Sequence, residues 1–226
     1  MQGSIPSTLG NLTNLVHLDL SGLDFTDPQP LPSSLGNLAN LQTLYLQHSK
    51  LQGSIPPSFG NLSSLTDLDM SSNNLMSLIP IELSHITTLT SLDLSGNFLS
   101  TPFPAKLPSS LKFLSLISTN VSGPIPDCIL HLPQILEIHL ENNRLSGPIP
   151  AALAELSTLQ YLGLGEALRT DQGWGYSIIA FCHDFCLVFS YVFPYVFYTL
   201  LYTCFPLLNK ILHGTLMIPT FARVST

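Results

Sequence analysis

The stretch LSSLTDLDMSSNNLMSLIP, residues 62–80, decides the fold of this chain. Leucine or a similar apolar residue recurs in it at fixed offsets, an asparagine follows, and an Ile-Pro pair closes it. The same frame returns 24 residues later, in residues 86–99. Self-similarity at such a period is typical of a solenoid, in which each unit packs only on its neighbours. The repeat therefore outweighs the general expectation of one or two globular domains for a chain of 226 residues.

Seven units can be aligned on the third leucine of the repeated core, and half a unit precedes them. Their frame, L-x-x-L-x-L-x-x-N-x-L, identifies them as leucine-rich repeats. Successive units are 26, 24, 24, 22, 24 and 24 residues apart. The aligned positions are Leu18, Leu44, Leu68, Leu92, Leu114, Ile138 and Leu162.

Each unit predicts one short strand, because residues along x-L-x-L-x alternate between two faces. The leucines point inward and pack on neighbouring units, so the strands stack in parallel. We expect an α/β repeat protein, a right-handed leucine-rich-repeat solenoid with a parallel β-sheet on its concave side. Its convex side should be irregular or 3-10 helical. The solenoid covers residues 1–168, and a hydrophobic C-terminal segment, residues 169–226, follows it.

Two proline-rich stretches change the spacing of the units. They are DPQPLPSS, residues 27–34, and TPFPAKLPSS, residues 101–110. Proline lacks a backbone donor and disfavours helical geometry in the residue before it. We therefore expect both stretches to be irregular, and the second to replace a short convex helical turn.

A polar residue after each strand is expected to bond backbone groups that the turn leaves unpaired, which forms a ladder between repeats. Asparagine suits this role, serine and threonine are weaker replacements, and leucine or alanine cannot fill it. We predict that Asn97→Ala destabilises the protein more than a surface change such as Gln52→Ala. The seven ladder positions are Leu23, Ser49, Asn73, Asn97, Thr119, Asn143 and Ala167.

Charge is sparse and acidic, with 7 Lys plus Arg against 14 Asp plus Glu and a net charge of −7. This balance excludes nucleic acid as a partner, because that needs clustered basic residues. The 4 cysteines form no disulfide framework. Cys182, His183 and Cys186 lack a second pair of ligands at the spacing of a zinc site.

The turn segments specify the class of repeat. G-x-I-P recurs in frame at Gly3, Gly53, Gly123 and Gly147, within units such as QGSIPPSFGNLSSL and SGPIPAALAELSTL. Residues 2–165 therefore resemble the plant-specific class of leucine-rich repeats. That class includes the ectodomains of receptor-like kinases and receptor-like proteins, and secreted polygalacturonase-inhibitor-like proteins. The resemblance implies a second strand at the G-x-I-P segment and an extracellular, glycosylated protein.

The chain departs from that class in having no cysteine-paired cap at either end and no kinase domain. Its opening, MQGSIPSTLG, has neither the basic start nor the apolar core of a secretory signal. Because it opens in the second half of a repeat, its start is expected to be truncated. Three N-x-S/T triplets mark acceptors for glycosylation, at Asn11, Asn61 and Asn120.

Ligand recognition is expected on the concave face, where Asp-Leu-Ser is the default strand of the class. Exposed aromatic side chains on a rigid sheet are usual anchors of a binding surface. Tyr45 and Phe113 also lie beside the two irregular units and could instead fill gaps there. The candidate ligand-binding residues are Tyr45, Gln47, His48, Asp67, Asp69, Asp93, Phe113, Glu137, His139 and Glu141.

Two pairs of carboxylates, Asp67/Asp69 and Glu137/Glu141, invite a catalytic interpretation. Strand alternation puts a pair on one face, near the separation of about 5–9 Å that glycoside hydrolysis uses. An open horseshoe, however, provides no enclosed pocket. His139 between two glutamates has the donor types of a metal site, but such residues on an open strand more often form a solvated face. We therefore predict no enzyme, no catalytic residue, no metal and no cofactor.

The C-terminal segment allows two interpretations. Residues 185–208 carry no charged side chain, and this stretch is long enough to span a bilayer. The basic residues that follow it would place the C-terminus on the cytoplasmic side of the membrane. Alternatively, its composition of Phe, Tyr, Leu, Val, Cys, Ser and Thr, with Pro194 and Pro206, is what a translated U-rich intron gives.

The predicted function is non-enzymatic recognition, by a fragment of a plant receptor-like protein or kinase ectodomain acting in signalling or defence. It would lie on the extracellular face of the plasma membrane or in the cell wall. Its partners would be a peptide, glycan or protein ligand and a co-receptor. The alternatives are a secreted polygalacturonase-inhibitor-like protein, favoured by free secretion, and a truncated gene product without independent function.

Overall fold

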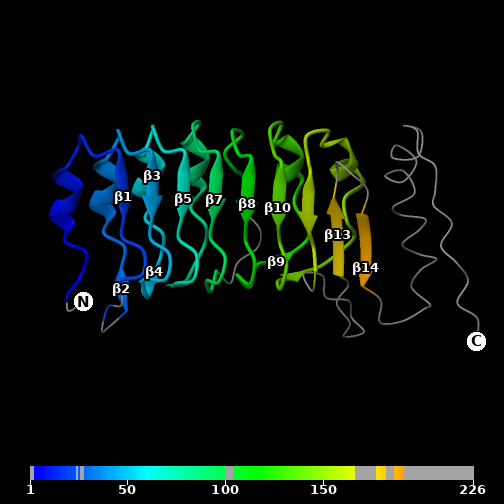
Figure 1. The fold of residues 1–226 in the computed structure, drawn as a ribbon, viewed down its shortest axis with the longest axis horizontal. Helices are drawn as coiled ribbons and strands as arrows, with labels where there is room; N and C mark the ends of the chain where they lie inside the picture. The colour runs from blue at the N-terminus through cyan, green and yellow to red at the C-terminus, as the bar shows by residue number, and fades with distance from the viewer. Residues whose placement is uncertain are drawn as a thin grey trace, which may run out of the picture.

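The repeats lie side by side along one axis, so the molecule is an elongated stack (Figure 1). The computed structural model describes residues 3–23, 25, 28–99, 104–165, 177–181 and 186–190. Each repeat adds one strand to a continuous main sheet, and most repeats return along a 3-10 helix. This confirms the predicted leucine-rich-repeat solenoid with a parallel sheet.

Seven three-residue strands of the main sheet run parallel, in the order of the chain. Their middle residues are the aligned leucines and Ile138, which are register partners from one strand to the next. The seven predicted strands are thus confirmed in position and register. They are β1 (His17–Asp19), β3 (Thr43–Tyr45), β5 (Asp67–Asp69), β7 (Ser91–Asp93), β8 (Phe113–Ser115), β10 (Glu137–His139) and β12 (Tyr161–Gly163).

Two further strands extend this sheet antiparallel beyond the last repeat, β13 (Ser177–Phe181) on β12 and β14 (Cys186–Ser190) on β13. The expectation of a membrane-spanning helix over 185–208 is therefore wrong for 186–190, which form a strand. The other residues of that range lie outside the described residues. Within the described ranges, no helix is long and apolar enough to cross a membrane.

A second set of strands follows five of the seven asparagine positions, as the resemblance implied. One small sheet contains β2 (Gln29–Pro30), β4 (Leu51–Gly53) and β6 (Asn74–Leu75), and the other contains β9 (Ser122–Gly123) and β11 (Arg144–Leu145). A single bridge between Met76 and Phe98 continues the first sheet. The 22-residue unit lies between these two small sheets.

In the part of the chain that the structure describes, six 3-10 helices form the convex side, and the N-cap of each is a proline in extended geometry. Proline fits there because its fixed φ suits a helix start and no donor is required before the first turn. They are η1 (Ser7–Asn11), η2 (Ser33–Asn37), η3 (Pro57–Asn61), η4 (Ile81–His85), η5 (Asp127–His131) and η6 (Ala151–Glu155).

The two proline-rich stretches differ from each other. The expectation of irregular structure over 27–34 is wrong, because Leu31-Pro32 takes the place of the Ile-Pro pair and starts η2 while Gln29–Pro30 forms β2. For 101–110 the expectation is confirmed where the structure describes it, since residues 104–112 contain a bend and a turn but no helix.

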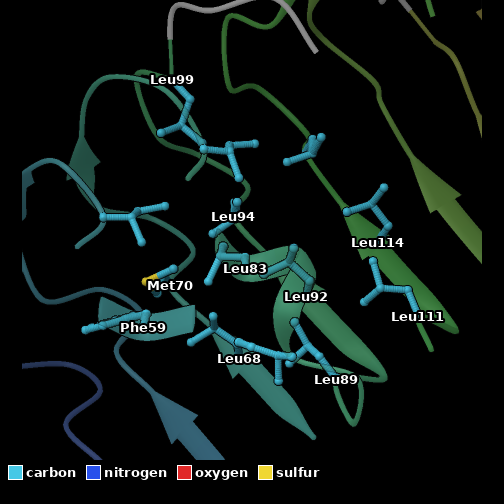
Figure 2. Packing of buried hydrophobic residues seen from close by; sticks show 14 of the residues in the cluster. Phe59, Leu68, Met70, Leu83, Leu89, Leu92, Leu94, Leu99, Leu111 and Leu114 are labelled. Atoms are coloured by element: carbon cyan, nitrogen blue, oxygen red, sulfur yellow. The ribbon is translucent and has the colours of Figure 1, made fainter. Parts of the chain in front are cut away.

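The core is one continuous cluster of leucines and other apolar side chains between the sheet and the convex helices. Side chains of successive repeats, such as Leu68, Leu92 and Leu114, follow one another along it (Figure 2). Phe59 of η3 is fully buried in it. No unit could bury its own leucines alone, so packing between repeats supplies the hydrophobic stabilisation.

The predicted polar ladder is confirmed at its asparagines, which are buried. Asn73 Oδ1 accepts hydrogen bonds from the backbone N–H groups of Ser49 and Leu51, both at 3.0 Å. Its Nδ2 donates to the carbonyls of Leu46 at 2.8 Å and Met70 at 3.0 Å. Each such amide thus joins its own turn to the turn of the preceding repeat.

The other ladder positions behave as their side chains allow. Asn97 accepts from Leu75 N–H, and Asn143 accepts from the N–H groups of Thr119 and Val121. Ser49 also takes part, because its Oγ accepts from Leu23 N–H at 3.2 Å. Ala167 lies outside the described residues.

A glycine precedes the final asparagine in each of the first three 3-10 helices and lets successive helices approach closely. A Cβ at Gly10, Gly36 or Gly60 would collide with the backbone of Ser34, Ser58 or Glu82 in the next repeat. The fourth helix carries Ser84 at this position. The unit that follows it is the 22-residue one, whose described part has no helix to collide with.

Candidate functional site

The concave face holds the predicted residues at defined places. Seven of the ten lie on strands of the main sheet, and Gln47 and Glu141 follow β3 and β10 by two residues. His48 instead occupies the turn after β3, exposed and with a φ of 55°. The structure thus places seven candidates on the sheet and three in the segments that follow its strands.

Three concave-face aspartates have a structural role in the turn that ends their strand. Each carboxylate accepts the backbone N–H of the serine two residues later, at 2.8–2.9 Å. In the first pair, hydrogen bonds from the side chain and backbone of Ser21 lower the pKa of Asp19. This explains why Asp-Leu-Ser recurs. The pairs are Asp19 with Ser21, Asp69 with Ser71, and Asp93 with Ser95.

Asp67 and Gln47 have different surroundings from these aspartates. Asp67 Oδ2 accepts a hydrogen bond from Thr66 Oγ1 at 2.9 Å. Gln47 Oε1 is buried and has no hydrogen-bond partner among the described residues. Neither side chain joins a ring or ion pair that would connect it with the other candidates. Tyr45 lies between Asp19 and Asp69 in register.

Five side chains of β8, β10 and β12 and the turn after β10 form one contact network, which we call the aromatic–acidic cluster. The ring of His139 is stacked on Tyr161, with centroids 4.2 Å apart and planes at 25°, and it lies 5.3 Å from Phe113. Its Nε2 is 3.1 Å from Glu137 Oε2, and its Nδ1 is 3.7 Å from Glu141 Oε1. The structure therefore unites Phe113, Glu137, His139 and Glu141 with Tyr161.

Strand register explains how this cluster forms. Phe113, Glu137 and Tyr161 are partners across β8, β10 and β12, so they stand in one row across the sheet. His139 lies two residues after Glu137 on the same strand, in register between Ser115 and Gly163 of the neighbouring strands. These small neighbours leave the imidazole room to lean against both rings.

Gly163 also admits the carboxylate of Glu141. A Cβ at Gly163 would meet the Glu141 carboxylate, so the absence of a side chain lets the carboxylate occupy this position, and a larger residue would displace it. In this position Glu141 Oε1 accepts a hydrogen bond from the Tyr161 hydroxyl at 2.8 Å. Glu141 Oε2 is buried without a hydrogen-bond partner among the described residues.

The charges in the cluster depend on one another. Burial alone would lower the pKa of His139, but hydrogen bonds to Glu141 and Glu137 outweigh it and raise that pKa. Burial would raise the pKa of Glu141, but its hydrogen bonds, that of His139 foremost, lower it. Burial and the bond to Glu141 raise the pKa of Tyr161 to about 12, so the phenol stays neutral. The arrangement therefore holds an imidazole between two carboxylates.

Sequence reasoning missed Tyr161 as a member of the cluster. The signal was present, since Tyr161 occupies the same strand position as Phe113, two units away, with Glu137 between them. Only the register and the space above Gly163 show that the tyrosine closes the cluster. In the described ranges, no group of three His, Cys, Asp or Glu side chains is arranged to hold a metal ion.

The three glycosylation acceptors lie outside this cluster. Asn11 and Asn61 are exposed at the last residue of η1 and η3, on the convex side. Asn120 is half-buried in the turn after β8, with a φ of 62°.

Comparison with known proteins gives consistent matches for the repeats. Residues 32–99 and 134–156 match two leucine-rich-repeat families. The ectodomain of the Arabidopsis thaliana receptor kinase GASSHO1/SCHENGEN3, solved with CASPARIAN STRIP INTEGRITY FACTOR 2, is 36% identical over 74% of this chain, with a TM-score of 0.71. The PEPR1–AtPEP1 complex is 36% identical over 74% of the chain, with a TM-score of 0.70.

The Arabidopsis receptor kinase HAESA, solved with an extended IDA peptide hormone, is 35% identical over 75% of this chain, with a TM-score of 0.63. The chain spans only 20%, 24% and 28% of the length of these three receptor chains. A search of curated protein sequences found no significant match. The repeat frame, the paired sheets and these similarities together establish that the chain belongs to the plant leucine-rich-repeat receptor-like family.

Proposed function

We propose that this chain is a non-enzymatic recognition segment of a plant receptor-like ectodomain, and that it binds an extended peptide along its concave face. The observation that carries the proposal is the aromatic–acidic cluster on a rigid parallel sheet. Aromatic side chains held by their neighbours lose little conformational freedom on binding, which suits them as anchors. The similar HAESA ectodomain was solved with a peptide hormone ligand, which supports the same class of ligand here.

The remaining candidate residues would extend this surface toward the N-terminus. Tyr45, Gln47, Asp67, Asp69 and Asp93 are half-buried and line the sheet from β3 to β7. A peptide crossing several strands would meet them in turn. A second HAESA structure, with the peptide hormone IDA, also contains the co-receptor SERK1, so a co-receptor is a proposed further partner. The extracellular space is the proposed location.

Selection from a library of random peptides displayed on phage, with the full 226-residue chain as bait, tests this proposal. Selected peptides are expected to bind the chain, and Phe113→Ala should weaken them about tenfold or more, as truncation of an aromatic anchor does. Phe98→Ala is the matched control, because Phe98 is an exposed aromatic of the small-sheet side, half accessible at 50%. Failure to select any peptide, or equal losses for both variants, would contradict the proposal.

We further propose that the chain carries N-linked glycans. In a eukaryotic secretory host, mass spectrometry should find glycans at the exposed Asn11 and Asn61, with lower occupancy at the half-buried Asn120. Asn37 is an internal control. Like Asn11 and Asn61 it is exposed at the end of a 3-10 helix, but Leu-Ala follows it, so it is not in an N-x-S/T triplet. Unmodified Asn11 and Asn61 in secreted protein would refute this expectation.

A further inference from the structure

We propose that the concave face carries a subsite for one basic side chain, arginine or lysine, of an extended peptide. The Glu137 carboxylate between the rings of Phe113 and Tyr161 would form this subsite, and protonation of His139 would regulate it. This inference rests on the proposed function, because it assigns the chemistry of one residue of the peptide ligand.

Glu137 is the accessible carboxylate of the aromatic–acidic cluster. Its side chain is 46% exposed, against 18% for both His139 and Glu141. It stands in register between Phe113 and Tyr161, whose rings are partly exposed on either side. A carboxylate flanked by two aromatic rings suits a cation, which gains an ion pair together with contact to the rings. A guanidinium fits best because it is planar and can stack as well as form two hydrogen bonds.

The rest of the sheet favours a basic ligand as well. The outward-facing positions of the seven parallel strands are their first and third residues. These positions hold five carboxylates and no Lys or Arg. A basic peptide would therefore meet complementary charge along the whole face, which steers its approach and fixes its direction. The five carboxylates are Asp19, Asp67, Asp69, Asp93 and Glu137.

His139 competes with the ligand for the same carboxylate. When His139 is protonated, its positive charge lies between Glu137 and Glu141 and compensates their negative charges. When it is neutral, the charges of both carboxylates are left without a cation from His139. On the β8 side, His139 faces Phe113 and Ser115, neither of which changes charge with pH in the range of the experiment. Lys112 comes just before them in the chain, and its side chain is exposed. On the β12 side, His139 faces Tyr161, which remains neutral, and Gly163.

The direction of the pH effect follows from this competition. The carboxylates hold the pKa of His139 above its usual 6.5, so the imidazole loses its proton as the pH rises through that raised value. A basic ligand should therefore bind more tightly at higher pH. Thermodynamic linkage makes this effect reciprocal: the free energy by which protonation of His139 weakens ligand binding is also the free energy by which the bound ligand lowers the pKa of His139.

The probe for the test is the peptide acetyl-Gly-Arg-Gly-amide, titrated into the full chain and followed by NMR of the aromatic rings. Its control is the same peptide with citrulline, which keeps the shape of arginine and removes the charge. At about pH 8 the arginine peptide should shift the ring signals of Phe113, His139 and Tyr161, and its affinity should fall about tenfold by about pH 5.5. The citrulline peptide should bind at least about tenfold more weakly at the higher pH.

Three variants separate the roles of the residues. Glu137→Gln should weaken the arginine peptide about tenfold at the higher pH. His139→Gln should remove the pH dependence, because the glutamine amide can still donate a hydrogen bond to Glu137 but does not titrate. Glu155→Gln is the control for charge, because Glu155 is exposed at the last residue of η6, on the convex side and away from the concave face. Circular dichroism of each variant checks that it is folded.

The outcomes distinguish this inference from the proposed function. Equal binding of the arginine and citrulline peptides, or full affinity in folded Glu137→Gln, overturns the basic subsite. Persistence of the pH dependence in His139→Gln overturns the role of His139. A library peptide that binds through Phe113 but ignores Glu137 overturns the subsite alone, whereas failure to select any peptide overturns the proposed function.

Discussion

Asn73→Ala is expected to lower the free energy of unfolding by about 3–5 kcal/mol, because it leaves several buried backbone groups without partners. The amide of Asn73 accepts from two backbone N–H groups and donates to the carbonyls of Leu46, Met70 and Ser71. Alanine can replace none of these bonds, and water cannot enter because the site is buried. The loss should exceed that of any exposed substitution in the same repeat.

Urea denaturation followed by circular dichroism measures this effect, with Asn74→Ala as the matched control. Asn74 is the next residue, its side chain is exposed, and it should change stability by less than about 0.5 kcal/mol. Gln52→Ala serves as a second control, since its exposed amide makes one bond, to the carbonyl of Pro28. Equal losses for Asn73→Ala and Asn74→Ala would show that the ladder does not stabilise the stack. The same comparison applies to Asn97→Ala, whose amide spans the next pair of turns.

Gly36→Ala is expected to destabilise the protein by about 1–3 kcal/mol, the usual cost of overpacking a close contact. The sign is informative, because glycine to alanine at an unstrained position normally stabilises by about 0.4–1 kcal/mol. The new Cβ would collide with the backbone carbonyl of Ser58 in η3, and neither side is a flexible side chain that could rotate away. The neighbouring repeats must therefore move apart.

The control for Gly36→Ala is Ser84→Ala, at the equivalent position of η4. Ser84 faces the 22-residue unit, and its Oγ donates to the carbonyl of Ile81 within its own turn. We expect a change within about 0.5 kcal/mol. A gain in stability from Gly36→Ala, measured in the same denaturation experiment, would mean that close approach of the 3-10 helices is not limiting.

The local rules of the repeat could be read from the sequence. Alternation along x-L-x-L-x identified the strands and their register, because an inward leucine cannot shift by one residue without exposing itself to water. The asparagine positions identified the ladder, since a buried turn needs a partner for its backbone groups. The sequence also predicted a convex side that is irregular or 3-10 helical, although it did not predict the helix that follows Pro32.

Tertiary structure decided what depends on contacts between units. The helix in residues 33–37 forms because Leu31-Pro32 takes the place of Ile-Pro, although the stretch is rich in proline. Residues 186–190 pair as a strand, although the uncharged stretch 185–208 that contains them has the length of a membrane-spanning helix. In both cases the neighbouring segment supplies hydrogen bonds or packing that local preference does not contain.

The candidate site shows the same division. Sequence alone selected Phe113, Glu137, His139 and Glu141 as departures from the default strand. Tyr161 joined them only in three dimensions, because its stacking on His139 depends on the strand register and its bond to Glu141 on the place that Gly163 leaves for that carboxylate. The sequence determined a rigid stack with a polar, acidic concave face. Which of its side chains meet was decided by the lateral distance between strands and by the empty volume above a glycine, neither of which is a property of a single repeat.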